Sequence, residues 1–479
     1  MISLNRIGFI SSLVVFGSFF NLIQIKAVEV SDKYDTLLAH IELKKGIDLL
    51  HTSMDYYFTT DNMVMHRFYN PFTKQRSAER ASVWMYTAVI EAVNAILKSM
   101  HQSGERMDIL RYEQLLENLY ANADYYLGTF ELTSFTQKKN WSVYAVDRVN
   151  ELGKARVTGI YNVYDDQMWL IRELLDSYHL TKNQKYLEKA EYLTAYVLDG
   201  WDATRDELGM EHGGIPWGPG YVTKHACSNG PMVSPLVWLY EIYKNKKDYI
   251  EYRFIDPKDK KARKSKNMFK RAYYLDFAQK IYNWQKKYLL RKDGVYADMM
   301  GGCDPNCSIN YETINGNTYR ANTILKSAMG RAYSYNAGTM LSGATDLYRV
   351  TKEKAYLDDA KELAKSSFAY FARKDAQVEN YYTFPTDGFN NWFNTVLLRG
   401  YTALLPFDKS ISVYVDAYRN NLNYGYSHFY MDGMLPTDLL KGWESDHTQN
   451  NIEGMFMFSY ITQFAIFNQY MQRYQKQIF

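Results

Sequence analysis

The spacing of apolar residues most narrowly limits what this chain can fold into. Along nearly the whole sequence, apolar residues recur at steps of three and four positions, which is the period of an α-helix with one buried face. The run Tyr186, Leu187, Ala190, Leu193 and Val197 is one example. Strand-type alternation is scarce, so the sequence predicts an all-α protein.

Two segments resemble each other, which indicates a repeated unit. Residues 181–193 read TKNQKYLEKAEYL, and residues 351–363 read TKEKAYLDDAKEL. Each follows a predicted helix that ends near a tyrosine, so the unit is a helix–turn–helix. Tetratricopeptide repeats, which recur about every 34 residues, do not fit the spacing.

Helices of two kinds alternate along the chain. Inner helices must be apolar on nearly all sides. Six segments have this character, and they lie at about 82–101, 163–179, 230–244, 333–350, 388–404 and 451–468. Six more amphipathic helices lie between them, near 32–58, 107–127, 184–199, 268–290, 353–373 and 409–423. This alternation predicts an (α/α)6 barrel, a toroid of six inner and six outer helices.

Polar residues gather where the inner helices begin. In an (α/α)6 barrel these starts open at one mouth, so the polar groups are expected to line a common pocket. Helix capping alone would account for about half of them, because Asp and Asn are common caps. The clusters are Asp165-Asp166, Ser228-Asn229, Tyr335-Asn336, Asp387 with Asn390-Asn391, and Asn450-Asn451.

Composition argues against a nucleic-acid partner. The chain has 56 Lys and Arg against 53 Asp and Glu, a formal net charge of +3, which gives no broad footprint for a phosphate backbone. The densest basic run, residues 244–266, also carries four acidic residues and is interpreted as a solvated insertion. The 44 Tyr and 9 Trp suit a carbohydrate cleft, although rings of this kind also fill helical cores.

Residues 1–27 have the pattern of an export signal. Arg6 supplies a positive start, residues 7–23 are almost wholly apolar, and Ala27 stands near a plausible cleavage point. Lys26 fits the cleavage rule poorly, so an uncleaved anchor is an alternative. No later stretch is apolar enough to span a bilayer. We therefore expect an exported protein, periplasmic or extracellular, in which residues 28–479 form a single domain.

The three cysteines do not suggest a metal site. Cys303 and Cys307 are close enough in sequence to close a small loop in an oxidising compartment, which would leave Cys227 unpaired. A metal site would need more ligands than these two, and we expect neither a metal ion nor a cofactor.

The adjacent carboxyls Asp165 and Asp166 open a predicted inner helix. Acidic residues favour a first helical turn for electrostatic reasons alone, so the pair by itself is a weak signal. It also suits chemistry, because retaining glycoside cleavage needs one ionised and one protonated carboxyl about 5 Å apart. Two close like charges raise the pKa of one partner, and the helix start helps to keep the other ionised.

Five segments together resemble glycoside hydrolase family 76, the α-1,6-mannanases. No one of these motifs is specific, but their order and spacing are. In the second of them, His225 stands where the family has Asn, and the third has one altered spacing. The segments are Tyr164-Asp165-Asp166 with the Trp169 helix, Lys224–Gly230, Asp293–Asp298, Tyr333–Gly338, and Asn391-Trp392-Phe393 up to Arg399-Gly400.

The resemblance implies an (α/α)6 catalytic domain that hydrolyses the α-1,6-mannan backbone internally and with retention. It implies Asp165 as nucleophile and Asp166 as acid/base. It further implies sugar contacts from Asn229, Asp298, Tyr335 and Asn336. To these the sequence adds Asp387 at a helix start and Trp217, whose glycine-rich loop is either a plain turn or a way of bringing the indole to the cleft. The expected partner is mannan or a mannooligosaccharide, bound by a monomer.

Other functions stay open at this point. Some fungal cell-wall members of the family are thought to transfer glycans, and the motifs do not separate transfer from hydrolysis. Another sugar enzyme on the same barrel, such as an unsaturated glucuronyl hydrolase or an epimerase, is a second hypothesis. A glycan-binding protein without activity is a third. The sequence contains no HExxH zinc motif and no GxSxG elbow.

Overall fold

Twelve α-helices make up the frame of the described chain, and each corresponds to a predicted segment. The computed structural model describes residues 37–60, 63–104 and 108–474, so the predicted export signal at 1–27 lies outside it. The inner helices are α2 (Val83–Ser103), α4 (Tyr164–Thr181), α6 (Val233–Tyr243), α8 (Ser334–Thr351), α10 (Asn390–Leu404) and α12 (Gly454–Tyr474). The outer helices are residues 37–57, α3 (Ile109–Ala123), α5 (Gln184–Asp199), α7 (Lys270–Leu289), α9 (Lys354–Phe371) and α11 (Ser412–Phe429).

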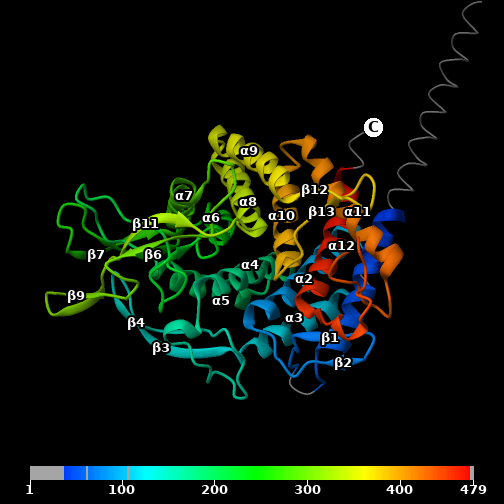
Figure 1. Ribbon diagram of the computed structural model, residues 1–479. Helices are drawn as coiled ribbons and strands as arrows, with labels where there is room; N and C mark the ends of the chain where they lie inside the picture. The colour runs from blue at the N-terminus through cyan, green and yellow to red at the C-terminus, as the bar shows by residue number, and fades with distance from the viewer. Residues whose placement is uncertain (1–36, 61–62, 105–107, 475–479) are drawn as a thin grey trace, which may run out of the picture.

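The inner helices form a closed ring. α2 packs on α4, contacts continue in chain order through α6, α8 and α10 to α12, and α12 packs back on α2 (Figure 1). Outside the ring, α3 packs on α2, α5 on α4, α7 on α6, α9 on α8 and α11 on α10. The predicted (α/α)6 barrel is therefore confirmed.

Burial follows the two kinds of helix. On the inner helix α12, every residue from 454 to 468 is buried, which only an apolar helix surrounded by others permits. The outer helix α9 buries one face, which includes Tyr356, Ala360, Leu363 and Phe371. Within the described part of the chain, no helix is both long and apolar enough to cross a membrane.

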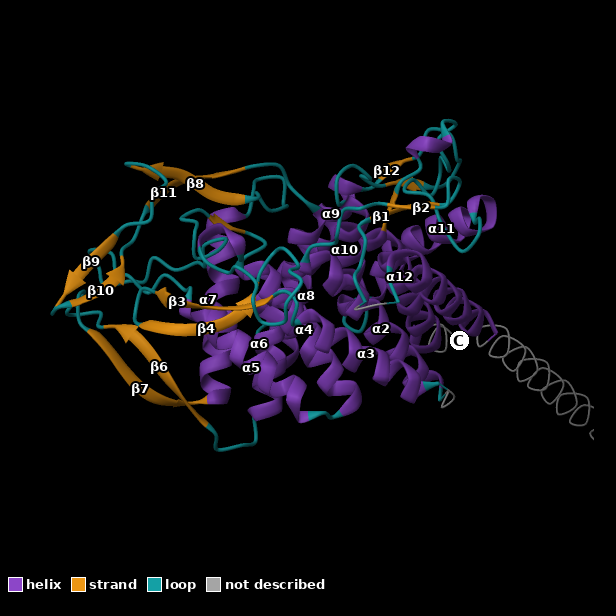
Figure 2. Cartoon of the chain, turned by 90° about the horizontal axis from the view of Figure 1, so that it is seen from below, coloured by secondary structure: helices purple, strands orange, loops and turns teal. Residues whose placement is uncertain are grey.

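Short antiparallel strands, which the sequence did not predict, decorate one mouth of the barrel. All but one pair lie in the segments that lead from an outer helix into the next inner helix, so they lie at the inner N-termini. Strands β3 to β11 gather on one side of the helices (Figure 2). The strands at this mouth are β1 (Phe68–Asn70), β2 (Gln75–Arg76), β3 (Leu127–Thr133), β4 (Lys138–Tyr144), β5 (Lys224–His225), β8 (Met299–Asp304), β9 (Tyr311–Ile314), β10 (Asn317–Arg320), β11 (Ile324–Met329), β12 (Arg373–Lys374), β13 (Tyr382–Thr383) and β14 (Ile452–Glu453).

The exception is the basic insertion between α6 and α7. The sequence suggested a solvated insertion, and much of its surface is indeed exposed. It is nevertheless ordered as a hairpin of β6 (Tyr249–Ile255) and β7 (Arg263–Phe269), in which Tyr249 pairs with Phe269 and Ile255 with Arg263. Five charged residues within these strands mask the alternation of apolar and polar residues in the sequence.

Two glycines let the inner helices α8 and α10 meet closely. A Cβ on Gly338 would lie 2.4 Å from the main-chain oxygen of Val396, and one on Gly400 would lie 2.9 Å from that of Gly338. We expect Gly338→Ala to lower the free energy of unfolding by about 2 kcal/mol, because one backbone must move away from the other. Urea unfolding followed by circular dichroism measures this loss.

Gly343→Ala is the matched control on the same helix. Both substitutions gain the same helix propensity, but the new Cβ at Gly343 meets only the Val233 side chain, at 2.8 Å. A smaller loss is expected there. Equal losses for the two variants would contradict the assignment of Gly338 to a backbone contact.

Candidate active site

The two adjacent aspartates lie in the first turn of α4. The helix is capped at Val163 without a side-chain hydrogen bond. A loop substitutes for part of the cap, since the Tyr164 N–H donates to the main-chain oxygen of Trp217 at 2.7 Å. This bond also fixes the Trp217 loop beside Asp165 and Asp166.

Asp165 is half-buried and held by several donors. The Trp217 Nε1 donates to its Oδ1 at 3.1 Å. The N–H groups of Asp165 and Asp166 and the thiol of Cys227 also donate to this carboxylate. Burial raises the pKa of Asp165 to about 6, and these donors keep it from rising further. The group is therefore mainly ionised at neutral pH.

Asp166 has the opposite character. It is buried, and burial together with the charges of Asp165 and the exposed Asp147 raises its pKa well above the usual carboxyl value. Burial and neighbouring charge therefore favour the protonated form of Asp166, whereas the donors around Asp165 favour its ionised form. That division is what cleavage of an acetal with a carboxylate and a proton donor requires.

Aromatic rings stand beside the carboxyl pair. Trp217 stacks on His225, with ring centroids 4.9 Å apart, and packs at 4.7 Å against Tyr221. His225 Nε2 lies 3.0 Å from Thr223 Oγ1. Burial lowers the pKa of His225 to about 4, so its ring is neutral at physiological pH. The Trp217 loop is thus no plain turn, because it brings an indole N–H to Asp165.

A buried ion pair anchors the Trp217 loop from behind. Lys224 Nζ donates to Asp202 Oδ2 at 2.7 Å and to the oxygen of Gly213 at 2.6 Å, and both side chains are almost inaccessible to solvent. Lys224 also begins the short strand β5, which pairs with β8. The ion pair therefore fixes the loop to the strand that leads to His225.

Asn229 supports the same loop and is fully buried. Its amide donates to the oxygens of Ile215 and His225 at 2.9 and 2.8 Å and accepts from the Ile215 N–H at 2.8 Å. In this arrangement the amide has no surface for a sugar, so the structure places Asn229 behind the site and not on its wall.

Asp298 and Tyr335 form a second wall. Tyr335 donates to Cys227, whose thiol in turn donates to Asp165. Asp298 is half-buried, and burial raises its pKa to about 6 against the opposing charge of Arg331. The structure therefore brings Asp165, Asp298 and Tyr335 together around Cys227, a residue whose part in the site the sequence did not indicate.

The last two predicted residues lie at different depths. Asp387 is exposed at the start of α10, where it pairs with Arg331 at 3.0 Å and accepts from Asn390 at 3.0 Å. Asn336 is fully buried, and its amide atoms have no hydrogen-bond partner within the described residues. Asp387 thus lies at the rim, and Asn336 lies below the surface that a ligand could reach.

Tryptophans close the floor of the site. Trp169, one turn after Asp166, packs edge-on against Trp392 at 4.8 Å. The Trp392 indole donates to Glu91 Oε2 at 3.2 Å, and Glu91 pairs with Arg399 at 2.6 Å. Trp169, Glu91 and Arg399 also line a cavity of about 240 Å³ inside the barrel. The floor is therefore held by charged groups from the barrel interior.

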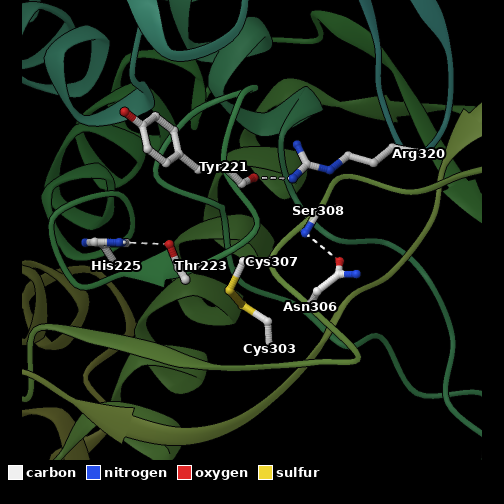
Figure 3. Close-up of a disulfide and its surroundings, with 8 residues drawn as sticks. All are labelled: Tyr221, Thr223, His225, Cys303, Asn306, Cys307, Ser308 and Arg320. Carbon is white, nitrogen blue, oxygen red and sulfur yellow. Dashed lines mark hydrogen bonds between the residues drawn. A yellow bond between two sulfur atoms is a disulfide. The ribbon is translucent and has the colours of Figure 1, made fainter.

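A disulfide-closed arm lies next to the aromatic rings. Cys303 and Cys307 form a disulfide at the end of β8, and Cys227 is free and buried. Arg320 of β10 donates to the main-chain oxygen of Tyr221 (Figure 3) and also to that of Pro219. The arm that carries the disulfide is therefore tied to the Tyr221 turn. No cluster of three or more His, Cys, Asp or Glu side chains in the described chain is arranged to hold a metal ion.

Comparison with known proteins agrees with this geometry. The model of glycosyl hydrolase family 76 matches residues 154–252 and 267–421, more than half of the chain. A comparison with curated proteins gave no match.

Solved structures of the family share the fold. A family 76 mannosidase from Bacteroides thetaiotaomicron is 19% identical with a TM-score of 0.66, and the alignment covers 89% of this chain and 98% of that one. An α-1,6-mannanase of Salegentibacter sp. HEL1_6, in an inactive variant with two adjacent aspartates replaced and α-1,6-mannotriose bound, is 18% identical with a TM-score of 0.58, covering 89% and 99%. Since the family model spans the carboxyl pair, the aromatic loop and both walls of the site, the chain belongs to glycosyl hydrolase family 76.

Proposed function

We propose that the protein is a retaining, endo-acting α-1,6-mannanase, with Asp165 as nucleophile and Asp166 as acid/base. The observation that carries the proposal is a pair of adjacent carboxyls at the start of α4, of which Asp165 accepts a hydrogen bond from the Trp217 indole and Asp166 is buried, with its pKa raised. The Salegentibacter mannanase adds support, because its inactive variant lacks two adjacent aspartates and binds α-1,6-mannotriose.

In the first step, Asp166 gives its proton to the glycosidic oxygen while an oxygen of Asp165 attacks C1 of the sugar. The C1–O bond breaks, the leaving sugar departs as an alcohol, and a glycosyl ester forms on Asp165. Asp166, now ionised, takes a proton from water, and this water attacks C1 and releases Asp165. Two inversions give overall retention.

The neighbouring groups have supporting parts in this proposal. Trp217 holds the nucleophilic carboxylate by its indole N–H and offers a flat ring to a sugar face. Asp298 and Tyr335 contact the sugar from the second wall, and Asp387 contacts a sugar farther out at the rim. Asn229 supports the Trp217 loop from behind the site, and Asn336 lies buried below the surface of the site.

The test is digestion of linear α-1,6-mannan. An endo-acting retaining enzyme releases a ladder of mannooligosaccharides, and proton NMR detects the α-anomer first. Products longer than the substrate oligomer would indicate transfer to another sugar in place of water. Release of mannose alone would contradict endo action. If the protein released nothing from mannan but cleaved another glycan, the proposed substrate would be wrong.

Activity is expected to fall as the pH drops below about 6. Asp165 must be ionised to attack, and protonation below its pKa of about 6 removes the nucleophile. The value of kcat/KM should then decrease by about tenfold per pH unit. Initial rates at low substrate concentration between pH 4 and pH 8 measure this fall, which is the acidic limb of the pH profile.

Asp298→Asn is the control for this pH profile, because the pKa of Asp298 is also about 6. If the acidic limb stays near pH 6 in this variant, Asp298 does not cause it. A limb near pH 4 in the unmodified protein would contradict the raised pKa of Asp165.

We further propose that residues 1–27 direct export and that residues 28–479 form one catalytic domain, active as a monomer outside the cytoplasm. The predicted signal agrees with the Cys303–Cys307 disulfide, since disulfides persist in oxidising compartments. Expression of the full chain, followed by cell fractionation and N-terminal sequencing, tests the proposal. A protein that keeps residues 1–27 and stays in the cytoplasm would contradict it.

A further inference from the structure

The hairpin between α6 and α7 concentrates positive charge. Residues 244–271 carry twelve Lys and Arg against four Asp and Glu, a net charge of +8, whereas the whole chain has +3. The rest of the chain is therefore net negative. The family model leaves out residues 253–266, the outer half of this hairpin. The positive charge thus belongs mostly to a segment that the family match does not explain.

Most of this charge is not neutralised by the protein itself. Arg253 pairs with Glu251, and Lys264 pairs with Asp256. Seven exposed lysines of the segment make no ion pair with any carboxylate of the described chain, and they are Lys244, Lys246, Lys247, Lys258, Lys260, Lys261 and Lys266. A solvated face usually interleaves both signs, and here one sign dominates.

The hairpin is fixed to the barrel at its outer end. It leaves α6 at the end of the barrel opposite the catalytic mouth, and strands of seven residues reach about 23 Å. Its tip meets loops of the catalytic mouth, where Arg205 Nε donates to the oxygen of Ile255 at 2.9 Å and Arg263 pairs with Glu312 at 2.7 Å. Figures 1 and 2 show β9 beside the β6–β7 hairpin. The lysines therefore form a fixed track that ends near the mouth.

We propose that this track, with Lys258, Lys260 and Lys261 at its tip, binds an acidic polysaccharide that carries phosphate or carboxylate groups. An ammonium group is strongly hydrated and gains most from an anion. A lipid surface fits less well, because Tyr249 is the only large hydrophobic side chain exposed on the two strands. The choice of a glycan over other polyanions rests on the proposed function.

A chain that occupies the track could continue into the catalytic mouth. The tip lysines follow Ile255, whose oxygen binds Arg205, and this arginine lies in the loop that leads on to Trp217. Fixed positive charge beside a cleft raises the local concentration of an anionic polymer and speeds its association. The track would then favour acidic glycans over neutral ones without touching the reacting sugar.

The experiment compares pairs of polymers that share a backbone and differ mainly in charge. The probes are linear α-1,6-mannan with its partly phosphorylated derivative, and fully methyl-esterified pectin with de-esterified polygalacturonate. Binding is measured at low and high salt on the full chain with Asp165→Asn, which leaves the polymer intact. We expect the acidic member of each pair to bind at least about tenfold more tightly at low salt, and the difference to vanish at high salt.

Two triple variants test which lysines cause the preference for acidic polymers. Replacement of Lys258, Lys260 and Lys261 by Gln should remove most of it, whereas replacement of Lys354, Lys361 and Lys365 by Gln on α9 should leave it unchanged. Circular dichroism confirms that both variants are folded. A preference that survives in the first variant, or equal binding of acidic and neutral polymers, would overturn the proposal.

Two further probes test the class of partner. Tighter binding to vesicles of phosphatidylglycerol, or to single-stranded DNA, than to either acidic glycan would also overturn the proposal. The pectin pair keeps the outcome separate from the proposed function: if the protein does not act on mannan, digestion of neutral mannan fails, but the charge preference is still measured.

Discussion

Replacement of Asp165 or Asp166 by Asn is expected to lower kcat on α-1,6-mannan by about a thousandfold or more. The first change removes the attacking carboxylate, and the second removes the proton donor. Binding of mannotriose should persist, because Asn has nearly the same volume and the walls and floor stay in place. Single-turnover rates and calorimetric binding measure the two effects separately.

Azide separates the two roles. With an activated α-mannosyl substrate, azide should restore turnover in both variants. In the Asp165 variant the azide attacks C1 directly and gives the β-azide, whereas in the Asp166 variant it attacks the glycosyl ester and gives the α-azide. The opposite pattern would exchange the assigned roles.

Asp147→Asn is the matched control for these variants. Asp147 is exposed, and its charge contributes to the raised pKa of Asp166 without belonging to the pair. Its loss should leave kcat within a few-fold and lower the pH at which Asp166 loses its proton. Full activity in either Asp165→Asn or Asp166→Asn would refute the proposed mechanism.

Replacement of Lys224 by Met is expected to lower the free energy of unfolding by about 3 to 5 kcal/mol. The variant leaves the Asp202 carboxylate buried without its cation, and the oxygen of Gly213 loses a donor. Because this pair fixes the Trp217 loop, activity should fall as well. Urea unfolding and initial rates measure the two losses.

Lys264→Met is the control, because its partner is also an aspartate but the lysine is exposed. An exposed ion pair contributes less than about 1 kcal/mol, so little should change. In a Lys224→Met background, Asp202→Leu should recover part of the stability by removing the unpaired charge. Equal losses in the Lys224 and Lys264 variants would show that burial of the first pair has no special weight.

The sequence was sufficient for the barrel because inner and outer helices differ in a property that residues carry locally. A helix such as α12 is apolar on every side whatever its neighbours are. The strand β5 was missed because it depends on a distant partner: it has two residues and exists through its pairing with β8, about 75 residues later.

For the site, the sequence identified the types of residue but not how deeply each side chain is buried. Asp165, Asp298 and Tyr335 were expected together, and the structure brings them together through Cys227. Asn229 and Asn336 were expected to contact sugar, yet both are fully buried. An Asn in a polar cluster is equally suited to a ligand and to a loop carbonyl, and only the folded chain decides between them.

The closure of the ring by α2 and α12 sets a condition on how the protein is made. Ser99 on α2 donates to the oxygen of Ala465 on α12, 366 residues later in the chain. At ordinary speeds of translation, roughly 20 to 70 s separate the synthesis of the two partners. During that time one edge of the unfinished barrel exposes apolar helix surface, which favours aggregation, and chains cut short before the last helix cannot close the ring.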